Sequence, residues 1–468
     1  MISDPILRDL AEIVGPTHLT TEPDDLAAHA SDATRLTYLP HAVVFPVDSH
    51  EVSRILALAS RERFPVIPRG AGTGQSGGAL PVQGGLVLAM DRFTRIVGID
   101  EENLVARVEP GVITAHLQEA VEARGLFYPP DPASIHISTI GGNVAECAGG
   151  LRAVKYGVTR DYVLGLEAVL PTGEIIRTGV ATAKGVVGYD LTRLLVGSEG
   201  TLAVITEIVL RLIPLPEAKK TMLAFFEDLA VAVRAVSTLI RSRIVPTTLE
   251  FLDRVCIECV REDMGIAVPE GATALLLIEV DGDETLVARD AERVREIVRQ
   301  AGATRFLEAR DPVEAERLWE ARRNVSPALQ GLRPGKVSED VVVPRSRLAD
   351  LVAHLQDLSR EHGQPIAAFG HAGDGNIHVH ILLDPDVPEE RENTERIVQA
   401  LFEEVIRMGG TLSGEHGVGI TKSRYLHLEL SPPVQGLMRR LKQSFDPHGI
   451  LNPGKIFPEP VPSGTIQN

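Results

Sequence analysis

The segment Gly-His-Ala-Gly-Asp-Gly-Asn-Ile-His-Val-His, residues 370–380, carries three of the chain's 14 histidines. Between the first two histidines stands Gly-Asp-Gly-Asn, residues 373–376, a combination typical of tight turns. Apolar runs flank the segment on both sides, so the pattern predicts a strand, a reversal and a second strand. His371 would then lie beside His378, and His378 and His380 would share one face because side chains alternate along a strand. Three imidazoles gathered beside a turn indicate a metal site, and a hairpin with surface histidines is the alternative.

Length and composition limit the class of protein. The 468 residues exceed the roughly 250–300 at which a single hydrophobic core stops growing, so two or three domains are expected. A net charge of −17 without a basic cluster argues against duplex nucleic acid as a partner. The N-terminus lacks the apolar core of a signal peptide, and no apolar run reaches the ~18 residues of a membrane helix. We therefore expect a cytoplasmic enzyme without a transmembrane segment.

The cysteines predict neither a disulfide framework nor a metal site. The chain has three of them, Cys147, Cys256 and Cys259. Cys256 and Cys259 form a CxxC that has no second pair. They are interpreted as packing groups on one face of a helix, with redox chemistry as the alternative.

The pattern of secondary structure changes at a Pro-rich segment, residues 213–220, which predicts a linker. Before it, the first forty residues have a helical pattern, and short strands dominate from about residue 66. After it, strands are expected at 274–280 and 336–343, with 341–344 at the end of the second, and helices at 229–243, 284–301, 312–329, 348–362, 393–408 and 434–445. This mixture predicts an α+β fold.

Three glycine-rich segments lie in the first half of the chain, at residues 68–78, 131–150 and 196–202. The first contains a GxGxxG pattern at 72–77. A Rossmann dinucleotide site requires a helix to begin at once, whereas this chain continues through a proline into a strand, so that interpretation is rejected. Glycine lets backbone amides approach phosphate oxygens closely. Three such loops predict an extended phosphate-bearing ligand, and tight surface loops are the alternative.

These segments resemble a known family. Pro68-Arg-Gly-Ala-Gly-Thr-Gly-Gln-Ser-Gly-Gly78, Thr139-Ile-Gly-Gly-Asn143 and Gly197-Ser-Glu-Gly-Thr201 resemble the FAD-binding motifs of vanillyl-alcohol-oxidase-type flavoproteins. The C-terminal half resembles the D-2-hydroxy-acid dehydrogenase branch, which includes the glycolate oxidase FAD subunit, D-lactate dehydrogenase and D-2-hydroxyglutarate dehydrogenase. The motifs that carry this second resemblance are His371-Ala-Gly-Asp-Gly-Asn-Ile-His378, Ser413-Gly-Glu-His-Gly-Val-Gly419 and Leu451-Asn-Pro-Gly-Lys455. The resemblance covers residues 35 to about 458.

The resemblance implies a two-part FAD-binding domain and a cap that binds substrate. The FAD domain would comprise residues 1–214, the cap with an antiparallel sheet residues 215–412, and a segment returning to the FAD domain residues 413–468. FAD would be bound non-covalently, because residues 69–78 contain no histidine. The residues expected to contact FAD are Arg69, Gly70, Ala71, Gly72, Thr73, Gly74, Gln75, Ser76, Asp131, Thr139, Gly142, Asn143, Gly149, Asp161, Glu199, Ile205 and Asn452.

The same resemblance assigns a catalytic set. It places a divalent metal (Zn, Mn or Fe) between His371, His378 and Glu415, and it makes His416 the general base. The substrate would be bound by residues on one face of the helix at 312–329 and by residues of the following strands. Arg322, with Arg323 as the competing choice, and Ser326 match the residues that contact its carboxylate. Lys336 matches a substrate lysine of the 2-hydroxyglutarate branch with a spacing one residue short, and His380 is left as a contact to substrate or metal.

The implied activity is oxidation of a small D-2-hydroxy acid, glycolate or D-lactate first, to the 2-oxo acid with hydride transfer to flavin N5. D-2-hydroxyglutarate is an alternative substrate, which the histidine at position 380 weakens because that branch has asparagine there. Two other classes remain open: a metal-dependent hydrolase, and a flavoprotein of the alkyl-glycerone-phosphate synthase type. Electrons would leave to a quinone, a cytochrome or a separate iron–sulfur subunit, and that partner could hold the chain at a membrane. A homodimer is left open.

Overall fold

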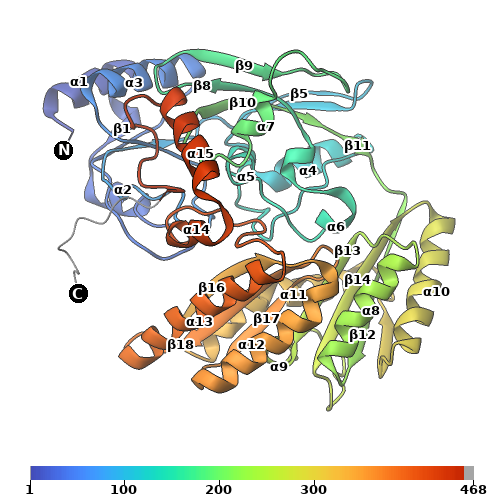
Figure 1. The fold of residues 1–468 in the computed structure, drawn as a ribbon. Coiled ribbons are helices and arrows are strands. Elements are labelled where there is room, and N and C mark those ends of the chain that lie inside the picture. The colour runs from blue at the N-terminus through green and yellow to red at the C-terminus, as the bar shows by residue number, and fades with distance from the viewer. Residues whose placement is uncertain (1, 458–468) are drawn as a thin grey trace. The chain divides into compact units, whose positions relative to one another are not determined.

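The computed structural model describes residues 2–457 and divides into two compact units. Within the described residues, unit 1 comprises 2–148, 158–215 and 415–457, and unit 2 comprises 149–157 and 216–414. The sequence had placed residues 149–157 in the first domain. Each unit is coloured in several separate bands in Figure 1, because the chain enters and leaves it more than once.

Unit 1 is built on two main sheets. The first has the order β1-β2-β4-β3, in which β2, β4 and β3 run parallel and β1 is antiparallel. The second is antiparallel, with the order β5-β6-β10-β8-β9. The strands are β1 (Leu19–Thr20), β2 (Ala42–Val44), β3 (Val66–Arg69), β4 (Leu86–Ala89), β5 (Ile96–Asp100), β6 (Val105–Val108), β7 (Leu126–Phe127), β8 (Val163–Val169), β9 (Ile175–Gly179), β10 (Val204–Arg211) and β11 (Ile213–Pro214). The helices are α1 (Asp4–Val14), α2 (Pro23–Ala28), α3 (Ser49–Glu62), α4 (Thr114–Glu122), α5 (Ile140–Glu146), α7 (Leu191–Leu195), α14 (Leu426–Glu429) and α15 (Pro432–Phe445).

The end of the described chain is part of the core of unit 1. Leu451 forms a parallel bridge with Val66 of β3, and the backbone bonds Val66 N–H to Ile450 O and Asn452 N–H to Val66 O are both 2.8 Å long. Ile450 and Leu451 are buried in the same apolar cluster as α1, α3 and the parallel strands. The red C-terminal segment therefore lies beside blue N-terminal elements in Figure 1.

Unit 2 is a seven-stranded antiparallel sheet with helices on both faces. The strand order is β15-β12-β14-β13-β17-β18-β16. The strands are β12 (Ala218–Phe226), β13 (Thr248–Asp253), β14 (Ala274–Gly282), β15 (Arg305–Glu308), β16 (Gly335–Val342), β17 (Ile366–His371) and β18 (Asn376–Leu383). The helices are α6 (Ala153–Tyr156), α8 (Leu229–Arg241), α9 (Arg254–Cys259), α10 (Glu284–Gln300), α11 (Pro312–Ala328), α12 (Leu348–His362) and α13 (Pro388–Arg407).

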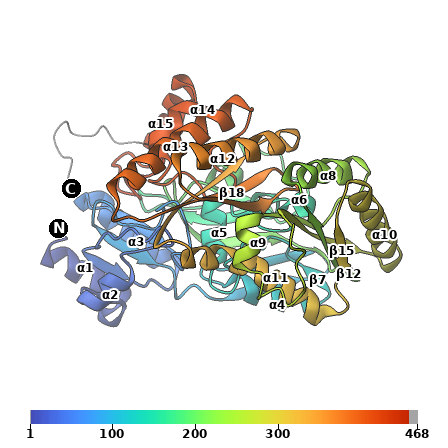
Figure 2. The same ribbon diagram turned by 90° about the horizontal axis from the view of Figure 1, so that it is seen from below.

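Local sequence signals explain where these helices begin. The side chains of Asp228, Asp283 and Asp311 accept backbone N–H groups at the starts of α8, α10 and α11, the usual preference for an N-cap. Helices α12 and α13 lie on one side of β18 and helices α9 and α11 on the other (Figure 2). Because both faces are covered, every residue of β18 is buried.

Several predicted elements differ from the structure. Among residues 2–40 the helices are α1, α2 and a short 3-10 helix at Pro16–His18, and the predicted linker at 213–220 contains β11 and the start of β12. Two lysines at the partly exposed start of β12 made the segment resemble a linker in the sequence, although the last six residues of this strand are all buried. The second glycine segment was expected to be a loop but contains α5, capped by Thr139 and held by buried Ile140 and Val144. Strands β13 and β15 were missed, whereas β16 (Gly335–Val342) agrees with the strand predicted at 336–343.

Candidate active site

The histidine segment forms the predicted hairpin. In the register of β17 and β18, His371 pairs with Asn376 and Phe369 pairs with His378. The rings of His371 and His378 are 5.2 Å apart and nearly perpendicular. His380 lies one pleat further along the same face, where its ring stacks on Phe369 at 5.0 Å. The prediction that these histidines share one face beside the turn is therefore confirmed.

His371, His378 and Glu415 bring one ligand atom each to within 4.8 Å of one another. Glu415 follows Gly414 in the chain, and the backbone N–H of Gly414 donates a hydrogen bond to Asp340 Oδ2 at 2.8 Å. Asp340 is paired in register with His378, so the chain itself holds Glu415 near the hairpin. Two imidazoles and one carboxylate are a donor set that suits Zn²⁺, Mn²⁺ or Fe²⁺ and leaves positions open for a substrate. The residues present thus fit the metal implied by the sequence. His416 follows directly in the chain.

The sequence analysis missed Glu250, which lies on β13 opposite His371 in the register. Its Oε1 is 2.6 Å from Nδ1 of His371, and its Oε2 accepts Nε–H of Arg322 at 2.7 Å. The side chain is fully buried. Burial raises the pKa of this carboxyl, but the charges of His371 and Arg322 and the hydrogen bonds from both outweigh burial and lower the pKa to about 2. Glu250 is therefore an ionised acceptor. A proton on Nδ1 of His371 would bond to this carboxylate, which makes Nε2 the ring nitrogen that would bind a metal.

A sequence signal for Glu250 existed. It stands in Thr-Leu-Glu-Phe-Leu-Asp, an otherwise mostly apolar run in which a carboxylate at a central, buried position calls for a partner. The pattern around the CxxC predicts a helix over residues 252–261, and this prediction left no room for a strand that ends at Asp253. That helix, α9, begins only at Arg254.

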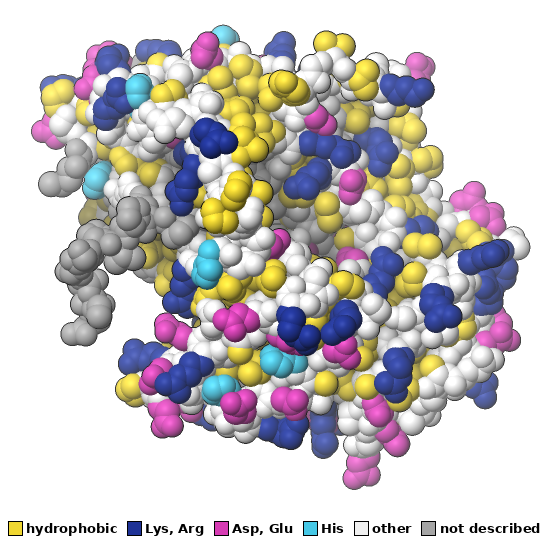
Figure 3. Space-filling model, viewed as in Figure 1, with side chains coloured by type: hydrophobic (Ala, Val, Ile, Leu, Met, Phe, Trp, Pro, Cys, Tyr) yellow, Lys and Arg dark blue, Asp and Glu magenta, His cyan; other side chains and the backbone are white. Residues whose placement is uncertain are grey.

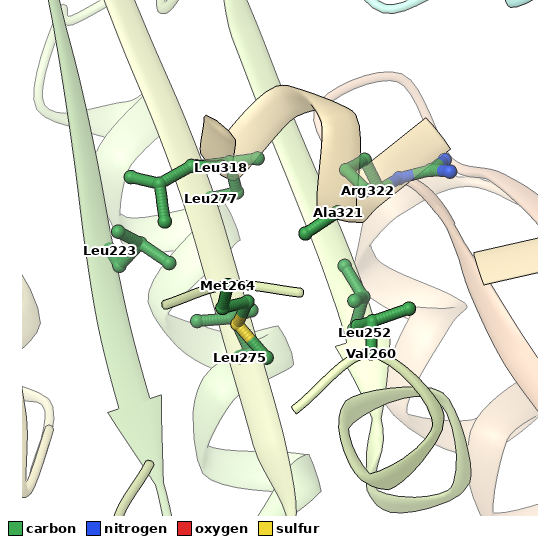
Figure 4. A pocket seen from close by; sticks show the side chains of 9 residues that line it. All are labelled: Leu223, Leu252, Val260, Met264, Leu275, Leu277, Leu318, Ala321 and Arg322. Atoms are coloured by element: carbon green, nitrogen blue, oxygen red, sulfur yellow. The ribbon is translucent and has the colours of Figure 1, made fainter. Parts of the chain in front are cut away.

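Arg322 is the buried arginine of α11, and Arg323 is not part of the site. The Arg322 guanidinium lies 4.6 Å from the centre of the Phe369 ring and forms an ion pair with Glu250. Arg323 instead pairs with Glu316 at the surface of α11. In Figure 4 the aliphatic part of Arg322 borders a small apolar cavity of about 10 Å³, while its guanidinium points away from the leucine and methionine side chains. The cavity is therefore a packing defect, and the charged group faces elsewhere.

The other predicted substrate residues lie along the neighbouring strands. Lys336 Nζ donates to both the carbonyl and the hydroxyl oxygen of Ser326, each at 2.6 Å. Ser338 pairs with His380 in the β16–β18 register, and its Oγ is 2.8 Å from His380 Nδ1. The polar side chains of Ser326, Lys336 and His380 are thus hydrogen-bonded to other residues of the protein.

In unit 1 the three glycine segments converge. A Cβ on Gly70 would stand 2.4 Å from Thr139 Oγ1, which brings the first segment against the second. The third segment joins the second through Gly197 N–H to Val144 O at 2.9 Å. Asn452 links the tail to both ends of this set, because its side-chain amide donates to Gly78 O and Glu199 O at 2.8 Å each.

The converging loops present polar atoms that need a ligand. Ser76 Oγ, Glu146 Oε2 and Asn452 Oδ1 are shielded from solvent and have no hydrogen-bond partner in the protein. Orphaned polar atoms are rare in native interiors, so their clustering at glycine loops fits a bound polar cofactor such as FAD. Glu146 was not predicted. It ends α5, one residue before Cys147.

The remaining predicted flavin residues are distributed around these loops. Arg69 ends β3 and donates to Ser31 O at 2.7 Å, Ile205 is buried in β10, and Asp161 accepts Val158 N–H at 2.9 Å. Asp131 and Asn143 are buried in unit 1, whereas Gly149 belongs to the segment that groups with unit 2.

Family models match both halves of the chain. Residues 215–456 match the family described as FAD linked oxidases, C-terminal domain, and residues 40–179 match the FAD binding domain. The Glycolate oxidase subunit GlcD of Bacillus subtilis (strain 168) is 46% identical over 458 residues, which cover 98% of this chain and 97% of that protein. A D-lactate dehydrogenase of Anaerostipes hadrus is 36% identical over 425 residues, 89% of each chain.

Solved structures show the fold. A p-cresol methylhydroxylase superposes with a TM-score of 0.81 at 19% identity, covering 97% of this chain and 96% of that one. An alkyldihydroxyacetonephosphate synthase superposes with a TM-score of 0.76 at 20% identity, covering 96% and 86%. The predicted α+β architecture, with a vanillyl-alcohol-oxidase-type FAD-binding part and an antiparallel cap sheet, is confirmed.

Proposed function

The chain belongs to the FAD-linked oxidase family, and on that premise we propose that it oxidises a small D-2-hydroxy acid to the corresponding 2-oxo acid. The observation that carries the proposal is the arrangement around Glu250. One carboxylate joins a ligand of the candidate metal site, His371, to the buried guanidinium of Arg322. A cation site beside an arginine matches the hydroxyl and carboxylate groups that a 2-hydroxy acid carries on adjacent carbons.

Each residue has a defined task in this proposal. His371, His378 and Glu415 would hold a divalent cation, which lowers the pKa of a hydroxyl group that it contacts. Arg322 would bind the substrate carboxylate, for which the planar guanidinium is well shaped. His416 would accept the hydroxyl proton as general base. FAD, when bound by the loops of unit 1, supplies the acceptor for the hydride from C2.

Glycolate and D-lactate are the proposed substrates, since the relatives include proteins named glycolate oxidase subunit and D-lactate dehydrogenase. His380, whose imidazole is stacked on Phe369 and bonded to Ser338, stands where the D-2-hydroxyglutarate branch has asparagine, which weakens that alternative substrate. We propose non-covalent FAD, and a quinone, cytochrome or separate iron–sulfur subunit as the electron acceptor.

The test is anaerobic flavin reduction. Yellow protein is mixed without oxygen with glycolate, D-lactate, D-malate or D-2-hydroxyglutarate. Its flavin absorbance should disappear with at least one of these acids. The L enantiomers of the chiral acids, and acids without the hydroxyl group, should leave the flavin oxidised. A flavin that stays oxidised with all four would sink the proposal. A colourless protein that hydrolyses a phosphate ester or an amide only in the presence of a divalent metal would favour the hydrolase instead.

The metal part is tested separately. Removal of divalent cations with a chelator should abolish flavin reduction by the hydroxy acid without releasing FAD, and Zn²⁺ or Mn²⁺ should restore it. Unchanged reduction in fully chelated protein would remove the metal from the mechanism.

A further inference from the structure

We propose that Glu250 couples the metal site to the carboxylate-binding site, so that Arg322 controls metal affinity although it is not a metal ligand. The inference rests on the proposed function and adds a dependence between its two halves. Three groups of unit 2 make the connection: the carboxylate of Glu250, the imidazole of His371 and the guanidinium of Arg322.

The two oxygens of Glu250 are divided between the two sites. Oε1 lies 2.6 Å from Nδ1 of His371. Oε2 accepts a hydrogen bond from Nε–H of Arg322 at 2.7 Å and also forms an ion pair with its Nη2. The β13–β17 register places Glu250 directly opposite His371, so the backbone fixes one half of the arrangement. The other half depends on Arg322, which reaches Glu250 from α11.

Burial makes the arrangement stiff. The side chains of Glu250, His371 and Arg322 are 0%, 7% and 8% exposed, and water therefore cannot replace a lost partner easily. The Phe369 ring below the guanidinium limits its orientations further. If Arg322 moves, Glu250 can turn to follow it, and the hydrogen bond that orients His371 is lost.

The chemical consequence concerns the ligand nitrogen of His371. A carboxylate on one ring nitrogen fixes the tautomer, aims the other nitrogen at the metal and raises its basicity. Loss of such a partner typically lowers metal affinity 10–100-fold. Nη1 of Arg322 remains for an incoming carboxylate, so substrate binding and metal binding would share the same anchor.

Metal affinity measured without substrate is the decisive experiment. Flavin-loaded protein is stripped of metal and titrated with Zn²⁺ and then with Mn²⁺ against a competing chelator dye. Glu250→Gln should bind each ion 10–100-fold more weakly than the wild type. Arg322→Lys should also weaken binding at least several-fold, and the double variant should lose less than the product of the two single losses because they act through one contact.

Glu279→Gln is the matched control. Glu279 is a buried carboxylate on the same face of the cap sheet, and it accepts Thr221 Oγ1 at 2.7 Å and Trp319 Nε1 at 3.0 Å without touching His371 or Arg322. Its variant should keep wild-type metal affinity. If Glu250→Gln does not fold, the Arg322→Lys titration alone decides the question.

The outcomes separate the two proposals. Metal affinity unchanged in both Glu250→Gln and Arg322→Lys overturns the coupling, even if the wild type oxidises hydroxy acids. A wild type that binds neither ion overturns the coupling and the metal part of the proposed function together. Weaker binding in Arg322→Lys, a variant that alters no ligand, supports the coupling whatever the substrate proves to be.

Discussion

Histidine side chains on a strand buried along its whole length have to be hydrogen-bonded or ligated, because an unpaired buried polar group costs free energy. β18 is such a strand, yet it carries His378 and His380 on one face. The neighbouring strand β16 carries polar residues at the paired positions, Ser338 opposite His380 and Asp340 opposite His378. Alternation along β18 could be predicted from the sequence, but the partners of its histidines come from β16, and the partner of His371 on β17 comes from β13; both strands are separated from the hairpin by long stretches of chain.

At the residue scale, His416→Ala tests the general base. The imidazole is the group expected to accept the substrate's hydroxyl proton, so its loss should slow flavin reduction by roughly 10²–10⁴-fold. FAD content and metal content should match the wild type, since His416 is assigned to neither group. Stopped-flow absorbance measures the reduction rate, and a rate equal to that of the wild type would remove His416 from this role.

Glu146 gives a pH-dependent prediction at the same scale. Burial first, and then the charges of Glu199 and Asp32, hold the pKa of Glu146 well above its usual value. The folded chain therefore keeps a proton that the unfolded chain releases, and the free energy of unfolding falls as the pH rises above about 4.5 and through the folded pKa. Glu146→Gln has no such proton, so it should be more stable than the wild type at pH 8, with a difference that shrinks toward pH 5.

The measurement is denaturant unfolding of flavin-free protein between pH 5 and 8.5. The groups around this carboxyl include cations as well, since Lys455 and Lys422 face Glu199, and Arg69 and Lys455 face Asp32. Comparing the variant with the wild type at each pH cancels their common contribution. Parallel pH profiles would show that Glu146 is ionised in the folded chain.

At the element scale, prediction worked best where a helix or strand has one clear period. Helices α8, α10, α11 and α12 were predicted within about two residues because each has an apolar stripe and a definite start or stop. β12 and β13 failed for a physical reason: a strand paired on both sides is defined by its neighbours, and Lys219, Lys220 and Glu250 interrupt the apolar run. Missing β13 also hid Glu250, so the candidate site was predicted without its central carboxylate.

The CxxC on α9 is interpreted as packing, and this can be tested with two matched substitutions. Cys256 is buried with its sulfur 3.8 Å from Ala368 O, whereas Cys259 is partly exposed, and both are free thiols. Cys256→Ala should cost roughly 0.5–1.5 kcal/mol of unfolding free energy, the range for deletion of one buried methyl-sized group. Cys259→Ala should stay within about 0.5 kcal/mol of the wild type.

Urea unfolding measures both costs, and the double variant tests the redox alternative. With no thiol left on α9, it should reduce its flavin at the wild-type rate. A large loss of reduction rate in a well-folded double variant would assign electron transfer to this pair.

At the scale of the whole molecule, charge and composition constrain partners. Figure 3 shows Lys and Arg side chains interspersed with Asp and Glu over the face in view, in keeping with a net charge of −17 and no continuous basic stripe. Among residues 2–457, no helix combines the length and apolar character needed to cross a bilayer. The electron acceptor would be recognised by the surface of the molecule, so its identity could not be predicted from the residues of the site alone.

The tail that closes unit 1 gives the last prediction. Asn452 adopts a left-handed φ of 45°, which asparagine and aspartate tolerate, and its amide donates to Gly78 and Glu199, more than 250 residues earlier in the chain. Asn452→Asp keeps the shape and the unpartnered Oδ1 but places an oxygen against two carbonyls. The loss of two buried donors should cost about 1–3 kcal/mol and weaken FAD binding roughly tenfold or more.

Fluorescence titration of flavin-free protein with FAD measures this affinity, and Asn103→Asp serves as the control. Asn103 bonds to Asp100 in an exposed turn of the same unit, so its variant should bind FAD like the wild type. Zn²⁺ affinity should be unchanged in Asn452→Asp, because Asn452 is not one of the candidate metal ligands. Equal FAD affinity in the Asn452 and Asn103 variants would mean that the returning tail completes the core of unit 1 without shaping its flavin site.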